Sequence, residues 1–353
     1  MITAPPFAQT ELDELINVDQ LLWDKLRGAR LFLTGGTGFF GRWMLESLSR
    51  ADDRLGLNVQ VIALMRHPEL FIENAPHLVS WKALRLIQGD VRDFDFPEEN
   101  FSHIIHLAAS SDATVQAADP LDLFSVIING TVHMLDFFHR CKAERFLFVS
   151  SGAVYGQQPA KLAAIPENYH GAPDPLLCQS VYGTAKRAAE QLCCLHNSKK
   201  TNSVLIARPF AFIGPGMPLD SHFAACNFIR DGIAGGPIYI NGDGTPLRSY
   251  LYASDLAWWL WKILMEGSPE QAYNVGGDKP VTILELAETV ANLFSPRVPV
   301  IVRQRPDDSK QPEKYIPDVS RVREKLGLCV RISLQEALKR TIAWHLKTRR
   351  ITK

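Results

Sequence analysis

Tyr182 and Lys186 stand four residues apart in the segment VYGTAKRAAE, a spacing that places both side chains on one face of a helix. A phenol has a normal pKa of about 10, and a nearby ammonium favours its ionised form. Tyr182 could then accept a proton from a substrate hydroxyl. The alternative is an ordinary pair of surface side chains, because this spacing also arises by chance.

A third group that can take part in this chemistry is Ser151, in the segment FVSSGAVYG. The strand-like run 145–151 ends here, and in open parallel sheets ligands bind outside the carboxyl ends of the strands. Ser151 could hold the same substrate oxygen as Tyr182. For Ser150 a role in a turn or a helix cap is an equally good interpretation.

A glycine-rich turn lies in LFLTGGTGFFG, Leu31 to Gly41, between a strand-like run and a helical pattern. In Gly35-x-x-Gly38-x-x-Gly41 one glycine allows a tight turn, one lets backbone N–H groups approach a pyrophosphate, and one allows close packing of helix on sheet. A turn built of glycine for backbone reasons alone is the alternative. The strand before it and the helix after it favour a dinucleotide cradle.

The cofactor that this cradle would hold is NAD or NADP, tightly bound. The acid expected at the end of the second strand to bind the ribose 2′-hydroxyl is absent, and Met65 and Arg66 occupy that place. An arginine there can pair with a 2′-phosphate, which favours NADP. Stacking of Arg66 on adenine, or exposure to solvent, remains open.

The fold that positions these groups is predicted to be α/β, because strand-like runs alternate with helical segments. The sequence predicts a Rossmann-type doubly wound parallel sheet and a smaller, mixed C-terminal substrate-binding region. We expect a helical extension over 1–28, a dinucleotide-binding domain over 29–208 with roughly 249–275, and the substrate-binding region over 209–248 and 276–348. The predicted strands are 30–34, 59–65, 84–90, 103–109, 145–151 and 203–209, with short strands near 237–252; the predicted helices are 10–27, 40–50, 122–140, 179–197, 222–234, 254–266, 282–294 and 333–348.

The composition suits a protein that binds a small ligand. The chain has 353 residues, 46% of them hydrophobic, and a formal net charge of zero, which argues against nucleic acid or an anionic membrane as partner. The N-terminus lacks a basic start and an apolar run, and no later stretch is expected to span a membrane, so we predict a cytoplasmic protein. The six cysteines show no CxxC pair, and neither disulfides nor a metal site is expected.

A set of motifs, in this order, resembles the extended short-chain dehydrogenases/reductases of the NAD-dependent epimerase/dehydratase family that act on nucleotide sugars, such as UDP-galactose 4-epimerase. The resemblance covers the chain from about Arg30 to Leu346. The motifs are TGGTGFFG, GDVRD, HLAA, NGT, SSGAVYG, YGTAK, RPFAFIGPG, NFI, GDGTPLRSYLYASDLA and AYNVGG.

The resemblance implies roles for particular residues and a homodimer formed through the helices 122–140 and 179–197. Ser151, Tyr182 and Lys186 would be catalytic. Ser151, Asn227, Arg248 and Arg305 would bind the sugar nucleotide, although plain solvent exposure competes for Arg305. The implied cofactor-binding residues are Gly35, Thr37, Gly38, Phe39, Phe40, Gly41, Arg66, Asp90, Val91, Leu107, Ala108, Ala109, Asn129, Tyr182 and Lys186.

The chain departs from the family pattern at three positions. Dehydratases of the family carry an Asp-Glu pair where this chain has Gly152 and Ala153, and the decarboxylases carry a glutamate at the position of Ala153. Both reactions therefore lack an expected acid or base. Ala211 replaces an asparagine that helps to hold the substrate nucleotide, which leaves the base open.

These observations predict a nucleotide-sugar epimerase that acts at C4 of an NDP-hexose through a 4-keto intermediate, with transient hydride transfer to the bound nicotinamide. An NADPH-dependent reductase of a 4-keto sugar nucleotide is the nearest alternative, followed by a decarboxylase or dehydratase. A dinucleotide-binding regulator without catalysis is the alternative from another class. The sugar, the base and the choice between NAD and NADP stay open.

Overall fold

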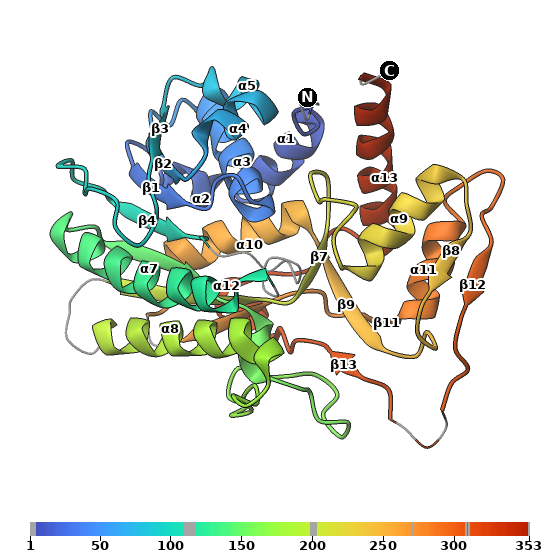
Figure 1. The fold of residues 1–353 in the computed structure, drawn as a ribbon. Coiled ribbons are helices and arrows are strands. Elements are labelled where there is room, and N and C mark those ends of the chain that lie inside the picture. Colours follow the sequence, from blue (N-terminus) through green and yellow to red (C-terminus); the bar gives the residue numbers. More distant parts are fainter. Residues whose placement is uncertain are drawn as a thin grey trace.

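The computed structural model describes residues 5–108, 118–197, 203–269, 271–307, 309 and 311–351. Its centre is a sheet of seven strands in the order β3-β2-β1-β4-β5-β6-β10, and every neighbouring pair is parallel (Figure 1). The order reverses between β1 and β4, which confirms the predicted doubly wound sheet. The strands are β1 (Arg30–Thr34), β2 (Gln60–Met65), β3 (Leu84–Gln88), β4 (His103–His106), β5 (Arg145–Val149), β6 (Ser203–Pro209) and β10 (Ala272–Val275).

Helices cover both faces of this sheet because successive side chains of a buried strand point to opposite faces. In β1, Leu31 and Leu33 join one hydrophobic cluster, while Phe32 between them joins the other. The first cluster includes residues of α1 (Gln9–Val18), α2 (Gln20–Asp24), α3 (Phe39–Leu55) and α10 (Ala253–Glu266). The second includes residues of α7 (Pro120–Arg140) and α8 (Val181–Asn197), which lie side by side on the other face in Figure 1.

The extra helix predicted over 10–27 is two helices. α1 ends at Val18, and Asp19 accepts a hydrogen bond from the Leu22 N–H at 3.1 Å, which caps the start of α2. An aspartate at this position competes with the helical backbone and starts a new helix. In the described part of the chain, three further short α-helices escaped the sequence analysis: α4 (Pro68–Asn74), α5 (Pro76–Val79) and α12 (Ser320–Leu326).

Among the described residues, α7 alone has the length and apolar composition of a membrane span, which the sequence analysis did not expect of any stretch. Its buried face, however, packs in the core of the protein. Leu123, Ile127, Met134 and Phe138 belong to the same hydrophobic cluster as the sheet residue Phe32. Its length and composition are those of a core helix as much as of a span.

The smaller region has its own hydrophobic cluster and lies beside the large sheet (Figure 1). A mixed sheet runs β11-β9-β13, with β7 also paired to β9, and a separate pair joins β12 to β8. Because β9 belongs to this sheet up to Tyr252, the chain returns to the large sheet slightly later than the expected boundary near 249. The elements are β7 (Ala211–Ile213), α9 (Ala224–Ala234), β8 (Ile238–Ile240), β9 (Leu247–Tyr252), β11 (Pro280–Thr282), α11 (Ile283–Ala291), β12 (Val300–Val302), β13 (Lys314–Tyr315) and α13 (Leu334–Ile351).

Two buried histidines on β4 should make the fold sensitive to acid. Burial lowers the pKa of His103 from 6.5 to about 4 and that of His106 to about 3. Below pH 6.5 the unfolded chain takes up protons at these sites, whereas the folded chain does not until about pH 4, so stability falls as the pH drops through this window.

We expect each histidine to contribute a slope of about 1.4 kcal/mol per pH unit within that window. Denaturant titrations at a series of pH values would measure it. His103→Gln keeps a partner for Ser102, whose Oγ lies 2.8 Å from His103 Nδ1, and should flatten the slope. Equal slopes in the variant and the parent protein would contradict this origin.

Candidate active site

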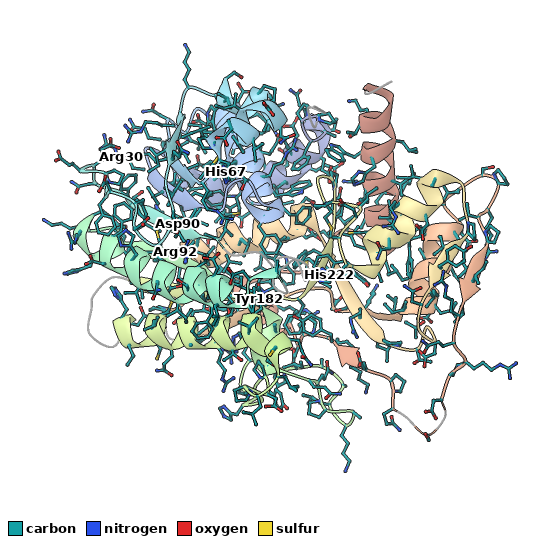
Figure 2. The ribbon with its side chains drawn as sticks, in the orientation of Figure 1. Arg30, His67, Asp90, Arg92, Tyr182 and His222 are labelled. Carbon is teal, nitrogen blue, oxygen red and sulfur yellow. The ribbon has the colours of Figure 1, made fainter. Side chains whose placement is uncertain are left out.

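The carboxyl ends of β1, β4 and β5 meet at one edge of the large sheet and carry the predicted site residues. The glycine turn follows β1, Leu107 follows β4, and Ser150 and Ser151 follow β5. α8 begins nearby and brings Tyr182 in its first turn. Figure 2 shows Tyr182 and His222 in the part of the molecule where the large sheet and the smaller region meet.

Ser151, Tyr182 and Lys186 line one cavity of about 450 Å³. Ser151 lies two residues beyond the end of β5 and caps the short helix η1 (Gly152–Tyr155), and its Oγ accepts a hydrogen bond from the Ala153 N–H at 3.1 Å. The Ser151 hydroxyl is also close enough to Tyr182 to lower the pKa of its phenol. Lys186, one helical turn beyond Tyr182, donates from Nζ to the Val149 carbonyl at 2.7 Å. The structure therefore brings the three predicted catalytic residues together.

Burial dominates the electrostatics of these side chains. It raises the pKa of Tyr182 to about 12, and the neighbouring Ser151 hydroxyl offsets only part of the rise. Burial also lowers the pKa of Lys186 to about 8. In the absence of a cofactor the phenol of Tyr182 is therefore neutral at neutral pH, and the predicted role of Lys186 and a nicotinamide charge in favouring its phenolate stays a prediction.

The glycine turn has the shape of a cradle. Gly35 has a φ of +74°, and a Cβ there would lie 2.8 Å from the Leu107 carbonyl carbon. A Cβ on Gly41 would lie 2.3 Å from the Gly35 oxygen, so only glycine lets α3 start this close to the turn. Gly38 is the N-cap of α3 and contributes no side-chain cap, which leaves N–H groups of the first turn for a ligand. These features fit a pyrophosphate.

A second cavity of about 450 Å³ lies against the same turn and shares Gly35, Gly38 and Leu107 with the catalytic cavity. A dinucleotide would lie across the turn, with its adenosine in the second cavity and its nicotinamide beside Tyr182. Phe39, Phe40 and Gly41 line the catalytic cavity. The predicted cofactor residues that line the adenosine cavity are Gly35, Thr37, Gly38, Arg66, Asp90, Val91, Leu107 and Ala108.

Asp90 is held in place by Arg92. The Arg92 Nε and Nη2 each donate to the Asp90 carboxylate at 2.8 Å, and this pairing holds the pKa of Asp90 below its usual value. Figure 2 shows the two side chains next to each other. Arg92 also donates to Asp122 on α7 at 2.6 Å, so the wall of the adenosine cavity is tied to the helix that covers the sheet.

Two of the predicted cofactor residues, Asn129 and Ala109, are not found among the described residues that line the adenosine cavity or the catalytic cavity. Asn129 is exposed on α7, donates to Ser125 Oγ at 3.1 Å and is not among the residues that line the adenosine cavity, so its cofactor role stays a prediction. Val126, one helical turn earlier, lines the cavity instead. Ala109 lies outside the described residues.

The predicted substrate residues Asn227, Arg248 and Arg305 do not line one common cavity. Asn227 on α9 lines a third cavity, of about 530 Å³, with Tyr239 and Arg303. Arg305 is exposed and is not part of that lining; Arg303, two residues earlier, lies there with its guanidinium carbon 4.8 Å from the Tyr239 ring centre. Arg248 lies on β9 opposite Tyr315 and pairs with Glu313 at 3.5 Å.

Residues 31–276 match the model of the NAD dependent epimerase/dehydratase family. The chain belongs to this family. It is 32% identical over 317 residues to UDP-glucuronic acid decarboxylase 1 of Arabidopsis thaliana, a match that covers 89% of this chain and 69% of the relative. UDP-glucuronic acid decarboxylase 6 of the same plant is 31% identical over 313 residues, 88% of this chain and 86% of the relative.

Solved structures show the same fold at lower identity. An epimerase of Methanothermobacter thermautotrophicus superposes with a TM-score of 0.78 at 22% identity, covering 95% of this chain and 97% of that one. UDP-glucuronic acid 4-epimerase from Bacillus cereus, in complex with UDP-glucuronic acid and NAD, superposes with a TM-score of 0.76 at 21% identity, covering 90% of this chain and 99% of that one.

The catalytic cavity of this chain is also lined by residues that the sequence analysis missed. Phe210, Tyr315 and His222 line the catalytic cavity, and His222 also lines the cavity of Asn227, so the two cavities adjoin. Phe210 lay within a recognised motif, RPFAFIGPG, which was a usable signal. Tyr315 lies far along the chain in a strand of two residues, where periodicity carries no signal.

Cysteine and metal chemistry receive no support from the geometry. All six cysteines lie among the described residues, and each is a free thiol. Within the described ranges, no group of three or more His, Cys, Asp and Glu side chains is arranged to hold a metal ion.

Proposed function

We propose that this protein is a nucleotide-sugar epimerase that acts at C4 of an NDP-hexose. The observation that carries the proposal is the shared cavity of Ser151, Tyr182 and Lys186 beside the dinucleotide cradle. Gly152 and Ala153 follow Ser151 and offer no carboxyl group to this cavity. Reversible oxidation of a hydroxyl is the reaction that a serine, a tyrosine and a lysine can support without a further acid.

In this proposal Tyr182 moves the proton and Ser151 holds the oxygen. Tyr182 receives the proton of the C4 hydroxyl and later returns it to the same oxygen. Ser151 hydrogen-bonds that oxygen while its charge changes. Lys186, fixed by the Val149 carbonyl, holds the cofactor ribose. When bound, the nicotinamide supplies the hydride acceptor and donor for C4 and a positive charge that favours the phenolate of Tyr182.

The substrate would lie across the two adjoining cavities. The nucleotide fits the cavity of Asn227, where Tyr239 and Arg303 can stack on a base and Asn227 can bond a phosphate. The hexose then reaches Tyr182 past His222, which lines both cavities. Names of relatives and structural neighbours that include UDP sugars support a UDP-linked substrate.

A UDP-glucuronate decarboxylase is the second candidate, because the two decarboxylases of Arabidopsis are about 30% identical over most of the chain. Oxidation at C4 is common to both reactions, and the same three residues would perform it. What speaks against decarboxylation is Ala153, which replaces the glutamate expected there from the family resemblance. A one-way NADPH-dependent reductase uses the same residues as well and stays the third candidate.

One assay separates these candidates. Purified protein is incubated with UDP-glucose, UDP-galactose, UDP-glucuronic acid and a 4-keto sugar nucleotide, with and without added NAD, NADP or NADPH, and products are identified by NMR. A C4 epimer formed without an external reductant supports the epimerase. Carbon dioxide and a UDP-pentose indicate the decarboxylase, and strict consumption of NADPH indicates the reductase. A chain that binds the cofactor and converts none of these substrates would be better explained as a regulator.

We propose that the cofactor site prefers NADP. Arg66 lines both the adenosine cavity and a neighbouring cavity with Thr37, Arg42 and His67, so a 2′-phosphate on the ribose would meet two cationic or ionisable side chains, Arg66 and His67. Met65 offers no carboxylate to the 2′-hydroxyl of NAD. Loss of a charge-assisted contact to phosphate costs roughly 1.5–3 kcal/mol.

Arg66→Ala should therefore weaken NADP binding by about tenfold to a hundredfold and change NAD binding little. Calorimetry with both dinucleotides measures this directly. His67→Ala tests the second contact, and Arg85→Ala, on a neighbouring strand and paired with Glu99, is the control for loss of one positive charge. Equal losses for NAD and NADP would contradict the proposal.

We also propose a homodimer formed through α7 and α8. Apolar side chains remain exposed on these helices, with Leu121 82%, Val132 49% and Leu195 51% exposed. Burial of such a face against its copy would remove them from water. Sedimentation equilibrium of the purified protein would test the association.

A further inference from the structure

Tyr315 enters the catalytic cavity from the smaller region. Its strand, β13, pairs with β9 so that Tyr315 lies opposite Arg248. The Tyr315 ring packs on Phe210 with 4.6 Å between ring centres, and the side chain lines the cavity that holds Ser151 and Tyr182. A Cβ placed on Gly152 would lie only 2.5 Å from the Tyr315 hydroxyl. The phenol therefore occupies the space beside Ser151 that a side chain at position 152 would fill.

The backbone around Tyr315 fixes this position. The next residue, Ile316, donates its N–H to Gln158 Oε1 at 2.9 Å and accepts a hydrogen bond from the Ile165 N–H at 2.8 Å. Gln158 and Ile165 belong to the loop that follows η1, which begins directly after Ser151. The segment carrying Tyr315 is thus tied to the segment carrying Ser151 by two buried hydrogen bonds, and the phenol has little freedom to move away.

Ser151 lines the same cavity as both phenols. Its hydroxyl has one hydrogen to donate and two lone pairs to accept with. One lone pair takes the Ala153 N–H, which leaves one lone pair and the hydroxyl hydrogen for the two phenols that line the same cavity. To bond with both phenols, Ser151 must accept from one and donate to the other. The phenol that donates to Ser151 sets the direction of the hydrogen bonds that link Tyr315, Ser151 and Tyr182.

We propose that Tyr315 is a positioning residue of the reaction, which donates its hydroxyl hydrogen to Ser151 and thereby turns the Ser151 hydrogen toward Tyr182. This direction is the one that a phenolate on Tyr182 requires, since an ionised oxygen only accepts. Hydrogen bonds in such a chain strengthen one another. The smaller region therefore completes the proton-moving centre of the large sheet.

The charged and ionisable groups around these three hydroxyls also favour donation from Tyr315 to Ser151. Lys186 of α8 and Arg248 of β9 contribute positive charge, Tyr155 of η1 adds a phenol near Tyr315, and His222 lines the same cavity. Burial raises the pKa of Tyr315 well above its usual value, and a second negative charge beside a Tyr182 phenolate is costly. Tyr315 therefore stays protonated and acts as the donor.

The decisive variant is Tyr315→Phe, which removes one oxygen and keeps the ring on Phe210. In the pH profile of kcat, we expect the apparent pKa that reports ionisation of Tyr182 to rise by about half a unit to one unit. At neutral pH, kcat should fall by about threefold to tenfold. KM should change less than kcat. Gly152→Ala displaces the Tyr315 hydroxyl without removing it, and it should raise the same apparent pKa.

Tyr155→Phe is the matched control. Tyr155 belongs to the same buried aromatic cluster, but its hydroxyl donates to Asn274 Oδ1 at 2.8 Å. We expect lower stability and an unchanged pH profile. If Tyr315→Phe also lost stability or kcat at every pH with the profile in place, Tyr315 would be a packing residue and the proposal would be overturned.

This inference rests on the proposed function, and a second measurement keeps the two apart. NMR of the substrate-free holoprotein, isotope-labelled at tyrosine Cζ, follows ionisation of Tyr182, assigned with Tyr182→Phe. Tyr315→Phe should raise the pKa of Tyr182 even if none of the assayed sugars is a substrate. An unchanged Tyr182 titration in an active enzyme refutes the role of Tyr315 and leaves the proposed function standing.

Discussion

Tyr182→Phe is expected to abolish turnover while the protein stays folded and binds its dinucleotide. The substitution removes the one oxygen that can exchange a proton with the substrate hydroxyl, and loss of a general acid or base costs roughly 10²–10⁴-fold in rate. The matching increase in the barrier is about 3–5 kcal/mol. Stopped-flow measurement of nicotinamide absorbance, with steady-state turnover of the substrate found in the product assay, would show the loss.

The phenyl ring should leave the cavity intact, because Tyr182 packs with its ring against the hydrophobic cluster of α7. Cofactor affinity and thermal stability therefore serve as controls and should change little. Tyr169→Phe, a tyrosine in the loop near the site, is the matched substitution and should retain activity. A Tyr182→Phe enzyme with more than a tenth of the parent rate would show that another group moves the proton.

In the parent enzyme, the ionisation of Tyr182 should depend on the bound dinucleotide. Without cofactor, burial keeps the pKa of Tyr182 at about 12, far from the pH at which a base is useful. A bound oxidised dinucleotide must therefore lower it. We expect the tyrosine titration to move to lower pH in the complex with NAD or NADP, and not in the complex with the reduced forms, which lack the ring charge.

The parts of this site that could be predicted are those with local signals. The glycine turn, the buried strand just before Ser151 and the Tyr182–Lys186 spacing each depend on a few consecutive residues, and the parallel sheet brings strand ends together by its topology. Asn129 and Arg305 show the limit of such local signals. Each lies close in sequence to a residue that lines a cavity, Val126 and Arg303 respectively, but does not line that cavity itself.

The contribution of the smaller region could not be predicted, because it depends on long-range pairing. Tyr315 reaches Ser151 only because β13 adds to β9 and because Gln158 and Ile165 bind the following residue. None of these partners is near it in the sequence. The effect of burial on Tyr182 could not be predicted for a similar reason: spacing shows that Lys186 shares its helix face, but not that burial raises the pKa of Tyr182 to about 12 in the absence of a cofactor.

A buried ion pair between α8 and β6 should carry a large share of the stability of the site. Arg208 Nη2 donates to Glu190 Oε2 at 2.5 Å, and Arg208 Nη1 donates to the Tyr155 hydroxyl at 2.7 Å. Glu190 lies one turn beyond Lys186 on α8, so the pair fixes the catalytic helix to the sheet. Both side chains are largely buried, at 15% and 9% exposure.

Glu190→Gln leaves the Arg208 guanidinium buried without its counter-charge, and we expect it to lower the free energy of unfolding by about 3–5 kcal/mol. Denaturant titration measures the loss. Arg208→Met should lower the free energy of unfolding by a similar amount, because it leaves the Glu190 carboxylate buried without its counter-charge. The double variant Glu190→Leu with Arg208→Met removes both charges and should recover much of the loss, since a buried pair replaced by apolar side chains of similar volume is often neutral.

The double variant also separates stability from catalysis. If the ion pair acts only by holding α8, the double variant should regain turnover along with stability, because Tyr182 and Lys186 return to their places. If Arg208 is needed for its bond to Tyr155, beside the aromatic cluster that packs on Tyr315, stability should recover and kcat should not. A Glu190→Gln protein as stable as the parent would contradict the premise that this pair is desolvated, and with it the view that α8 is anchored at this point.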